Sequence, residues 1–236
     1  MRSDLSKLMH YGGTQASYNV YHDAVVIENL LSKPSQKSRR LAWRHLAGLY
    51  SLSSDHCLFR VFRDFYFFDQ QAQPLLTFQL AYARDPVLRA CMPFLSRLSL
   101  NQQISRADTE ELLKTLYPQR FTPASLKSCA QNINGTWTQS GFLQGKVRKT
   151  RVQPVVSWVN AAYALFMASL QGHQARMMLT SQWVRILGLP EEEILQLASR
   201  AAQKGLMDYR RTGDVMEFRF PDSLTEQEHE WLNESY

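Results

Sequence analysis

The chain contains few cysteines: Cys57, Cys91 and Cys129 are the only three among 236 residues. No two of them form a CxxC pair, so the sequence provides no disulfide framework. An odd, sparse set of thiols is typical of a protein of the reducing cytosol. The first residues also lack the apolar run of a signal peptide. We therefore expect a cytoplasmic protein.

The common motifs of catalysis are missing as well. The six histidines are scattered, and none has the HExxH spacing or another metal-ligand spacing. The phosphate-loop patterns GxxxxGK[ST] and GxGxxG are absent, and Asp64 and Asp69 diverge on the helix expected there. We therefore expect no enzymatic activity, no cofactor, no metal and no small-molecule substrate.

Charge is missing from one stretch, because the 24 residues between Arg151 and Arg176 contain no Asp, Glu, Lys or Arg. That length is sufficient to cross a membrane. The stretch also contains polar residues such as Asn160 and Gln171, and its large apolar residues recur at helical spacing. These features favour a buried helix of a soluble domain over a membrane span.

The charges that are present are distributed unevenly. Residues 1–151 contain 20 Lys and Arg against 10 Asp and Glu, a net charge of +10, whereas residues 152–236 contain 7 against 11, a net charge of −4. A basic body suits a polyanionic partner, and an acidic end suits a partner of another kind.

Helix start and stop signals predict a mostly α-helical protein in three parts. Residues 1–104 have the pattern of a helical bundle, and no convincing strand pattern occurs before residue 140. Residues 105–154 follow the order helix, short turn, polar helix, hairpin, which is typical of a winged helix-turn-helix unit. Residues 155–236 hold an apolar helix, a second winged-helix-like unit and an acidic tail. The expected fold is a helical bundle whose winged helix-turn-helix-like units carry short β-hairpins.

The 105–154 unit has the residue types of a DNA reader. A recognition helix needs short polar side chains for base edges and phosphates, and the helix that Thr122 is expected to cap supplies them. The segment 145–154 adds the cations that a wing needs at the DNA backbone. An ordinary polar surface helix followed by a basic linker is the alternative. The candidate DNA-binding residues of this unit are Ser125, Lys127, Ser128, Gln131, Asn132, Lys146, Arg148, Lys149 and Arg151.

A second basic segment lies in the first part of the chain. Ser35 is expected to cap a helix that continues to about Tyr50, with Leu41, Leu46 and Leu49 facing inward. Its cations either form a solvated surface or contact phosphates. They are Lys37, Arg39, Arg40 and Arg44.

The second winged-helix-like unit has a different charge pattern. Glu191, Glu192 and Glu193 lie at the start of its second helix, where they suit the helix dipole but repel phosphates. Arg210 and Arg211 lie on its hairpin and are candidates for DNA contact through the wing alone. We favour a role for this unit in dimerisation or in docking to a partner protein.

Three stretches within residues 25–150 carry a resemblance to a known family. They are "ENLLSKPSQKSRRLAWRHL", the aromatic-rich helix at 58–68, and "RADTEELLKTLYPQRFTPASLKSCAQNINGTWTQSGFL". In these stretches the chain resembles the BrxA family, small accessory proteins of bacterial BREX phage-defence systems. The resemblance covers about half of the chain and implies a helical, winged-helix protein that binds DNA without being an enzyme.

Together the charge and helix patterns predict a non-enzymatic protein that binds double-stranded DNA mainly through phosphates, and the resemblance implies that it is an accessory protein of phage defence. Its other expected partners are further subunits of a defence complex, and a homodimer stays open. Two alternatives stay open as well. One is a protein-interaction adaptor that acts through the C-terminal unit, and the other is a dimeric transcriptional regulator with a defined half-site spacing.

Overall fold

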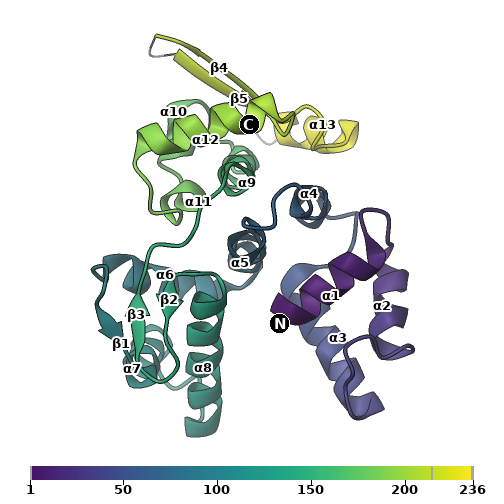
Figure 1. Cartoon of the computed structure of the whole chain (residues 1–236), viewed down its shortest axis with the longest axis vertical. Coiled ribbons are helices and arrows are strands. Elements are labelled where there is room, and N and C mark those ends of the chain that lie inside the picture. Colours follow the sequence, from purple (N-terminus) through teal and green to yellow (C-terminus); the bar gives the residue numbers. More distant parts are fainter. Residues whose placement is uncertain (1, 214, 235–236) are drawn as a thin grey trace.

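The structure, a computed structural model, describes residues 2–213 and 215–234. This part of the chain is mostly helical and has two small antiparallel sheets (Figure 1). The helices are α1 (Arg2–Gly12), α2 (Tyr18–Val26), α3 (Gln36–Tyr50), α4 (Cys57–Tyr66), α5 (Gln73–Arg84), α6 (Pro86–Arg97), α7 (Arg106–Leu116), α8 (Pro123–Gln139), α9 (Trp158–Ser169), α10 (Arg176–Leu179), α11 (Gln182–Arg185), α12 (Glu191–Gln203) and α13 (Glu226–Glu234). The strands are β1 (Gln103–Ile104), β2 (Leu143–Gln144), β3 (Lys149–Arg151), β4 (Asp208–Thr212) and β5 (Val215–Arg219).

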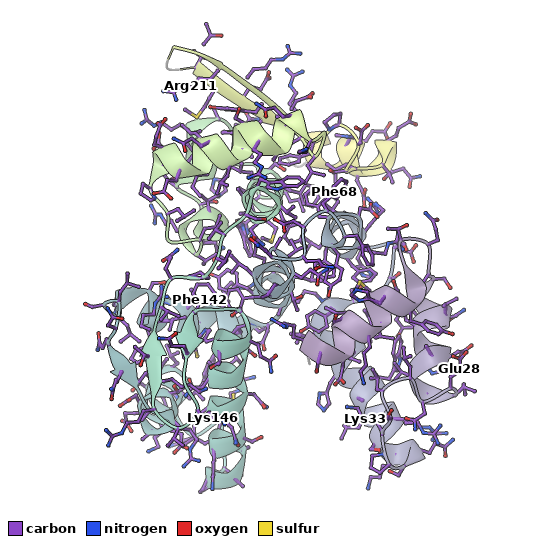
Figure 2. The ribbon with its side chains drawn as sticks, in the orientation of Figure 1. Glu28, Lys33, Phe68, Phe142, Lys146 and Arg211 are labelled. Atoms are coloured by element: carbon purple, nitrogen blue, oxygen red, sulfur yellow. The ribbon has the colours of Figure 1, made fainter. Side chains whose placement is uncertain are left out.

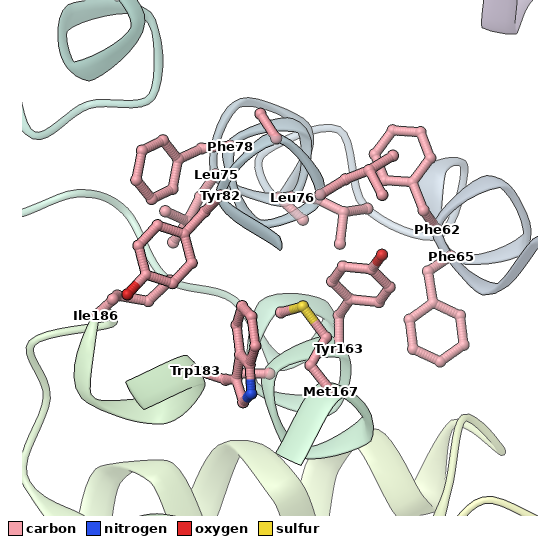
Figure 3. Packing of buried hydrophobic residues seen from close by; sticks show 14 of the residues in the cluster. Phe62, Phe65, Leu75, Leu76, Phe78, Tyr82, Tyr163, Met167, Trp183 and Ile186 are labelled. Atoms are coloured by element: carbon pink, nitrogen blue, oxygen red, sulfur yellow. The ribbon is translucent and has the colours of Figure 1, made fainter. Parts of the chain in front are cut away.

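Helix α9 lies at the centre of the core. Every side chain from Trp158 to Ala168 is buried. The side of this helix that carries small residues is therefore enclosed as fully as the side that carries large ones. In Figure 3, Tyr163 and Met167 of α9 lie among the aromatic and aliphatic side chains of α4, α5 and α11. The buried apolar helix expected here is confirmed. Among the described residues, no helix is long and apolar enough to span a bilayer.

A group of hydrogen bonds centred on Asn160 and Gln79 joins α9 to α5 inside this core. The Gln79 side-chain amide donates to the Asn160 carbonyl at 2.9 Å. The Asn160 side-chain amide donates to the Ala72 carbonyl at 3.0 Å and to Gln79 Oε1 at 3.2 Å. Asn160 Oδ1 accepts the Ser157 amide at 3.0 Å. Because Asn160 and Gln79 are both completely buried, these bonds satisfy groups that water does not reach.

Two arms extend from α5 on the same side of the molecule (Figure 1). The first, here called the α3 arm, consists of α1, α2 and α3. The second, the α8 arm, consists of α6, α7, α8 and the strands β1 to β3. The α9–α13 unit lies on the opposite side of α4 and α5. Figure 2 places Lys33 near the free end of the α3 arm and Lys146 near the free end of the α8 arm.

The two long helices of the arms begin where the sequence predicts. The Ser35 hydroxyl accepts the Ser38 amide at the start of α3, and the Thr122 hydroxyl accepts the Ser125 amide at the start of α8. Leu46 is fully buried as expected, but Leu41 is 43% exposed, which corrects its expected inward orientation.

The α8 arm contains a three-stranded sheet with the order β1-β3-β2. Its two-residue strand β1 was not expected, because two residues are too few for a periodicity. Gln103 and Ile104 of β1 pair with Thr150 and Lys149 of β3. The boundary predicted at residue 104 therefore lies between two strands that pair with each other, β1 and β3.

The C-terminal unit has the predicted order of elements. A short helix α11 precedes α12, and the antiparallel hairpin β4–β5 follows. The last helix, α13, is joined to α4 by an ion pair between Arg60 and Glu228. The Glu228 carboxylate also accepts the Thr225 amide at 2.8 Å.

Candidate nucleic-acid interface

One face of α8 presents polar side chains to solvent. Ser125, Ser128 and Asn132 are exposed and recur at intervals of three and four residues, so they lie in one row along the helix. Lys127 and Gln131 are exposed beside this row. The Ser125 hydroxyl is already engaged at the helix start, where it donates to the Thr122 carbonyl at 3.0 Å.

The other side of α8 holds the helix in place. Leu126, Ala130, Ile133 and Trp137 are buried there. The buried Asn134 accepts a hydrogen bond from the Thr109 hydroxyl of α7 at 2.8 Å. The polar row is thus carried by a helix whose orientation is fixed by packing against α7.

The loop between β2 and β3 follows directly on α8 and β2. Lys146 and Arg148 are exposed and form no ion pair or hydrogen bond with the described residues. Val147 between them is 89% exposed. This loop, Gly145–Arg148, therefore offers two cations to a partner.

Lys149 and Arg151 have structural roles instead, which corrects their assignment as free wing cations. Lys149 Nζ donates to the Thr138 hydroxyl at 2.8 Å and ties β3 to α8. Arg151 is only 7% exposed, lies over the Phe142 ring, and donates to the Phe142 and Val152 carbonyls. Burial lowers the pKa of its guanidinium. A phosphate outside the protein does not reach this group.

The cations of α3 divide in the same way. Lys37, Arg40 and Arg44 are exposed and lie at intervals of three and four residues along one face. Arg39 points elsewhere, because its guanidinium donates to the Val26 and Ile27 carbonyls at 3.1 and 3.2 Å and holds the end of α2. Three of the four predicted cations of this helix are thus available to a partner.

The rows on α3 and α8 both lead to a cleft between the two arms. The cleft has a volume of about 670 Å³ and is walled by α3 and α8, with α5 between them. Arg44 lines one wall, and Gln131 and Asn132 line the other. Three side chains from two separate predicted segments therefore meet at one site.

Arg2 and Arg84 line this cleft too, and neither was among the residues predicted from the sequence. Arg2 Nη1 donates to the Gln139 carbonyl at 2.9 Å, and Arg84 Nη2 donates to the Gly48 carbonyl at 3.3 Å. Arg84 Nε is buried without a hydrogen-bond partner, and burial lowers the pKa of this guanidinium. Neither arginine belongs to a basic cluster in the sequence, and only the fold brings the two together.

Arg210 and Arg211 lie apart from these residues. Both are exposed on β4, and Figure 2 places Arg211 at the end of the molecule opposite Lys146. Arg210 lines a separate groove of about 930 Å³ beside α10. The hairpin cations therefore do not belong to the surface that α3 and α8 form, and any DNA contact they make is a separate one.

No group of three or more His, Cys, Asp or Glu side chains within residues 2–213 and 215–234 is placed to hold a metal ion. Comparison of the chain with protein-family models, curated proteins and solved structures gives no match. The resemblance to the BrxA family therefore stays a prediction.

Proposed function

We propose that this protein binds double-stranded DNA through the α8 arm. The observation that carries the proposal is the order α6-β1-α7-α8-β2-β3 with the sheet order β1-β3-β2. We interpret this order as that of a winged helix-turn-helix, with α8 proposed as the recognition helix and the Gly145–Arg148 loop proposed as the wing.

The side chains available on this arm suit nucleic acid. Ser128, Gln131 and Asn132 offer hydroxyl and amide groups to base edges and phosphates. Lys146 and Arg148 offer charges that have no partner among residues 2–213 and 215–234, and phosphates release counterions when they meet such cations. Counted together with the exposed Lys37, Arg40 and Arg44 of α3, these cations outnumber the three polar side chains. We therefore expect strong salt dependence and weak sequence preference.

The α3 arm extends the proposed interface. Lys37, Arg40 and Arg44 lie on the face of α3 that leads to the cleft, and the polar row of α8 leads to the same cleft. A duplex held by α8 would meet these cations on the second arm. The proposal therefore includes contacts to the duplex from both arms.

Replacing Lys37 and Arg40 by Gln tests the proposed contacts of the α3 arm. We expect the affinity for a fluorescein-labelled duplex of random sequence to fall about tenfold near 0.1 M salt, because about two phosphate contacts are lost. The matched control is the R185Q/R200Q variant, which removes two exposed cations of α11 and α12. Fluorescence anisotropy measures both. Equal affinity of K37Q/R40Q and wild type would restrict the interface to the α8 arm.

The C-terminal unit supports a second proposal, that of an adaptor. Glu191, Glu192 and Glu193 are exposed at the start of α12, and Glu191 pairs with Arg176 at 2.9 Å. Acidic side chains at this position oppose phosphate contact and suit a basic protein surface. We propose that this unit docks to another subunit while the arms hold DNA.

The anti-phage context rests on the family resemblance alone. We keep it as a proposal, together with the dimeric regulator. A regulator would protect two half-sites with palindromic spacing in a footprint, whereas phosphate-based binding would protect no defined sequence.

A further inference from the structure

The cleft between the arms contains an excess of positive charge. Arg2, Arg44 and Arg84 come from three different helices, and none forms an ion pair with any described residue. Among the described residues, Asp85 is the one carboxylate that lines the cleft, and it is engaged at the start of α6, where it accepts the Val87 and Leu88 amides at 2.8 and 3.1 Å. Three cations thus share a concave site with one carboxylate that is already hydrogen-bonded.

The hydrogen bonds of two of these arginines fix them without neutralising them. Arg2 donates one N–H to a carbonyl near the end of α8, and Arg84 donates one N–H to a carbonyl near the end of α3. A helix end carries only about half a negative charge, so each site keeps a positive charge. Each guanidinium has five N–H donors, and the bond described for each uses a single one of them. Both are therefore held in position with donors to spare.

Two glycines provide an independent indication of a ligand. Gly48 in α3 and Gly135 in α8 line the cleft from its two walls. A glycine inside a helix makes the helix less stable than an alanine would, by roughly 1 kcal/mol. Packing does not require it here, since a Cβ at either position would meet no atom within 4 Å. Smooth walls at these points suit a molecule that approaches the backbone of both helices.

We propose that the cleft is a phosphate-binding site in which Arg2, Arg44 and Arg84 contact the anion and Gly48 and Gly135 leave room for it. Its volume of about 670 Å³ falls within the range of about 300–1,000 Å³ typical of small-molecule sites. The side-chain amides of Gln131, Asn132 and Gln139 line the same cleft and suit the sugar or base that carries the phosphate. The phosphate belongs either to a free nucleotide or to the backbone of a bound nucleic acid.

Calorimetric titration of the full chain with inorganic tripolyphosphate at low salt tests this site. We expect one saturable site in the wild type and a loss of about tenfold in affinity on removing a guanidinium by R44Q or R84Q. R200Q, which removes an exposed arginine outside the cleft, is the control and should bind as the wild type does. Absence of saturable binding to the wild type, or an equal loss in R200Q, would overturn the proposal.

A second variant covers the case in which an arginine variant fails to fold. Gly135→Leu places a large side chain in the open space of the cleft on a good helix former. We expect its melting temperature to equal or exceed that of the wild type while tripolyphosphate binding is lost by more than tenfold. Wild-type tripolyphosphate affinity in folded G135L would contradict the proposal.

Two further measurements identify the source of the phosphate. Displacement of a labelled duplex by tripolyphosphate, together with weaker duplex binding by G135L, would assign the site to the backbone of nucleic acid. Binding of ATP without displacement of the duplex would assign it to a free nucleotide. Both results support the site. It is separable from duplex binding by the wing, since the K146A/R148A variant should keep its tripolyphosphate affinity.

Discussion

Reversing the two exposed charges of the Gly145–Arg148 loop, in the K146E/R148E variant, should lower the affinity for duplex DNA about a hundredfold near 0.1 M salt. The loss of two phosphate contacts accounts for part of this effect, and repulsion between each new carboxylate and the backbone adds to it. The loss should be about equal on all duplex sequences, because phosphates carry no sequence information. Anisotropy titrations on several unrelated duplexes measure both features.

The second hairpin provides a matched control. R210E/R211E reverses two exposed charges on β4, at the end of the molecule opposite Lys146 (Figure 2). We expect the affinity of this variant to change by less than about threefold, since only long-range and salt-screened effects act there. If R210E/R211E lost as much affinity as K146E/R148E, net charge rather than the α8 arm would govern binding.

Asn160→Leu should lower the free energy of unfolding by about 4 kcal/mol. The change leaves the Ser157 amide, the Ala72 carbonyl and Gln79 Oε1 without their partner in a site closed to water. Each buried polar group without a partner costs about 1–3 kcal/mol. A typical domain has a free energy of unfolding of about 5–15 kcal/mol, so we expect this variant to lose a large part of its stability. Urea denaturation followed by circular dichroism measures the change.

Two comparisons separate the lost hydrogen bonds from other effects. Asn132→Leu makes the same substitution on the exposed face of α8 and should change stability by no more than about 0.5 kcal/mol. The Q79L/N160L double variant should lose less than the sum of its single variants, because it removes both members of one contact. Additive losses would mean that Gln79 and Asn160 are not energetically coupled.

Local signals allowed most helices to be predicted from the sequence. Ser35, Ser105 and Thr122 are caps whose side chains accept amides of the first helical turn, and capping depends on a few neighbouring residues. Within the predicted bundle of residues 1–104, the first 20 residues carry little pattern, so α1 was not predicted individually although Leu5, Leu8 and Met9 are buried at helical spacing. Strand β1 was beyond prediction, because its two residues are defined only by pairing with β3 some 45 residues later.

The candidate site could be predicted only in part. Residue type identified Lys146, Arg148 and the polar row of α8, and the structure leaves these side chains exposed. Residue type did not distinguish Arg151, whose burial depends on the Phe142 ring and carbonyl beside it. The cleft was not predictable either, since Arg2 and Arg84 reach it only through the arrangement of the two arms.

The salt dependence of duplex binding tests the central claim most directly. For the wild-type chain on a random duplex, the logarithm of the binding constant should fall linearly with the logarithm of the salt concentration. The expected slope is between about −3 and −5, which corresponds to the three exposed cations of α3 and the two of the Gly145–Arg148 loop. In K146A/R148A the slope should be smaller in magnitude by about two. Binding that is independent of salt, or no binding at low salt, would contradict the account.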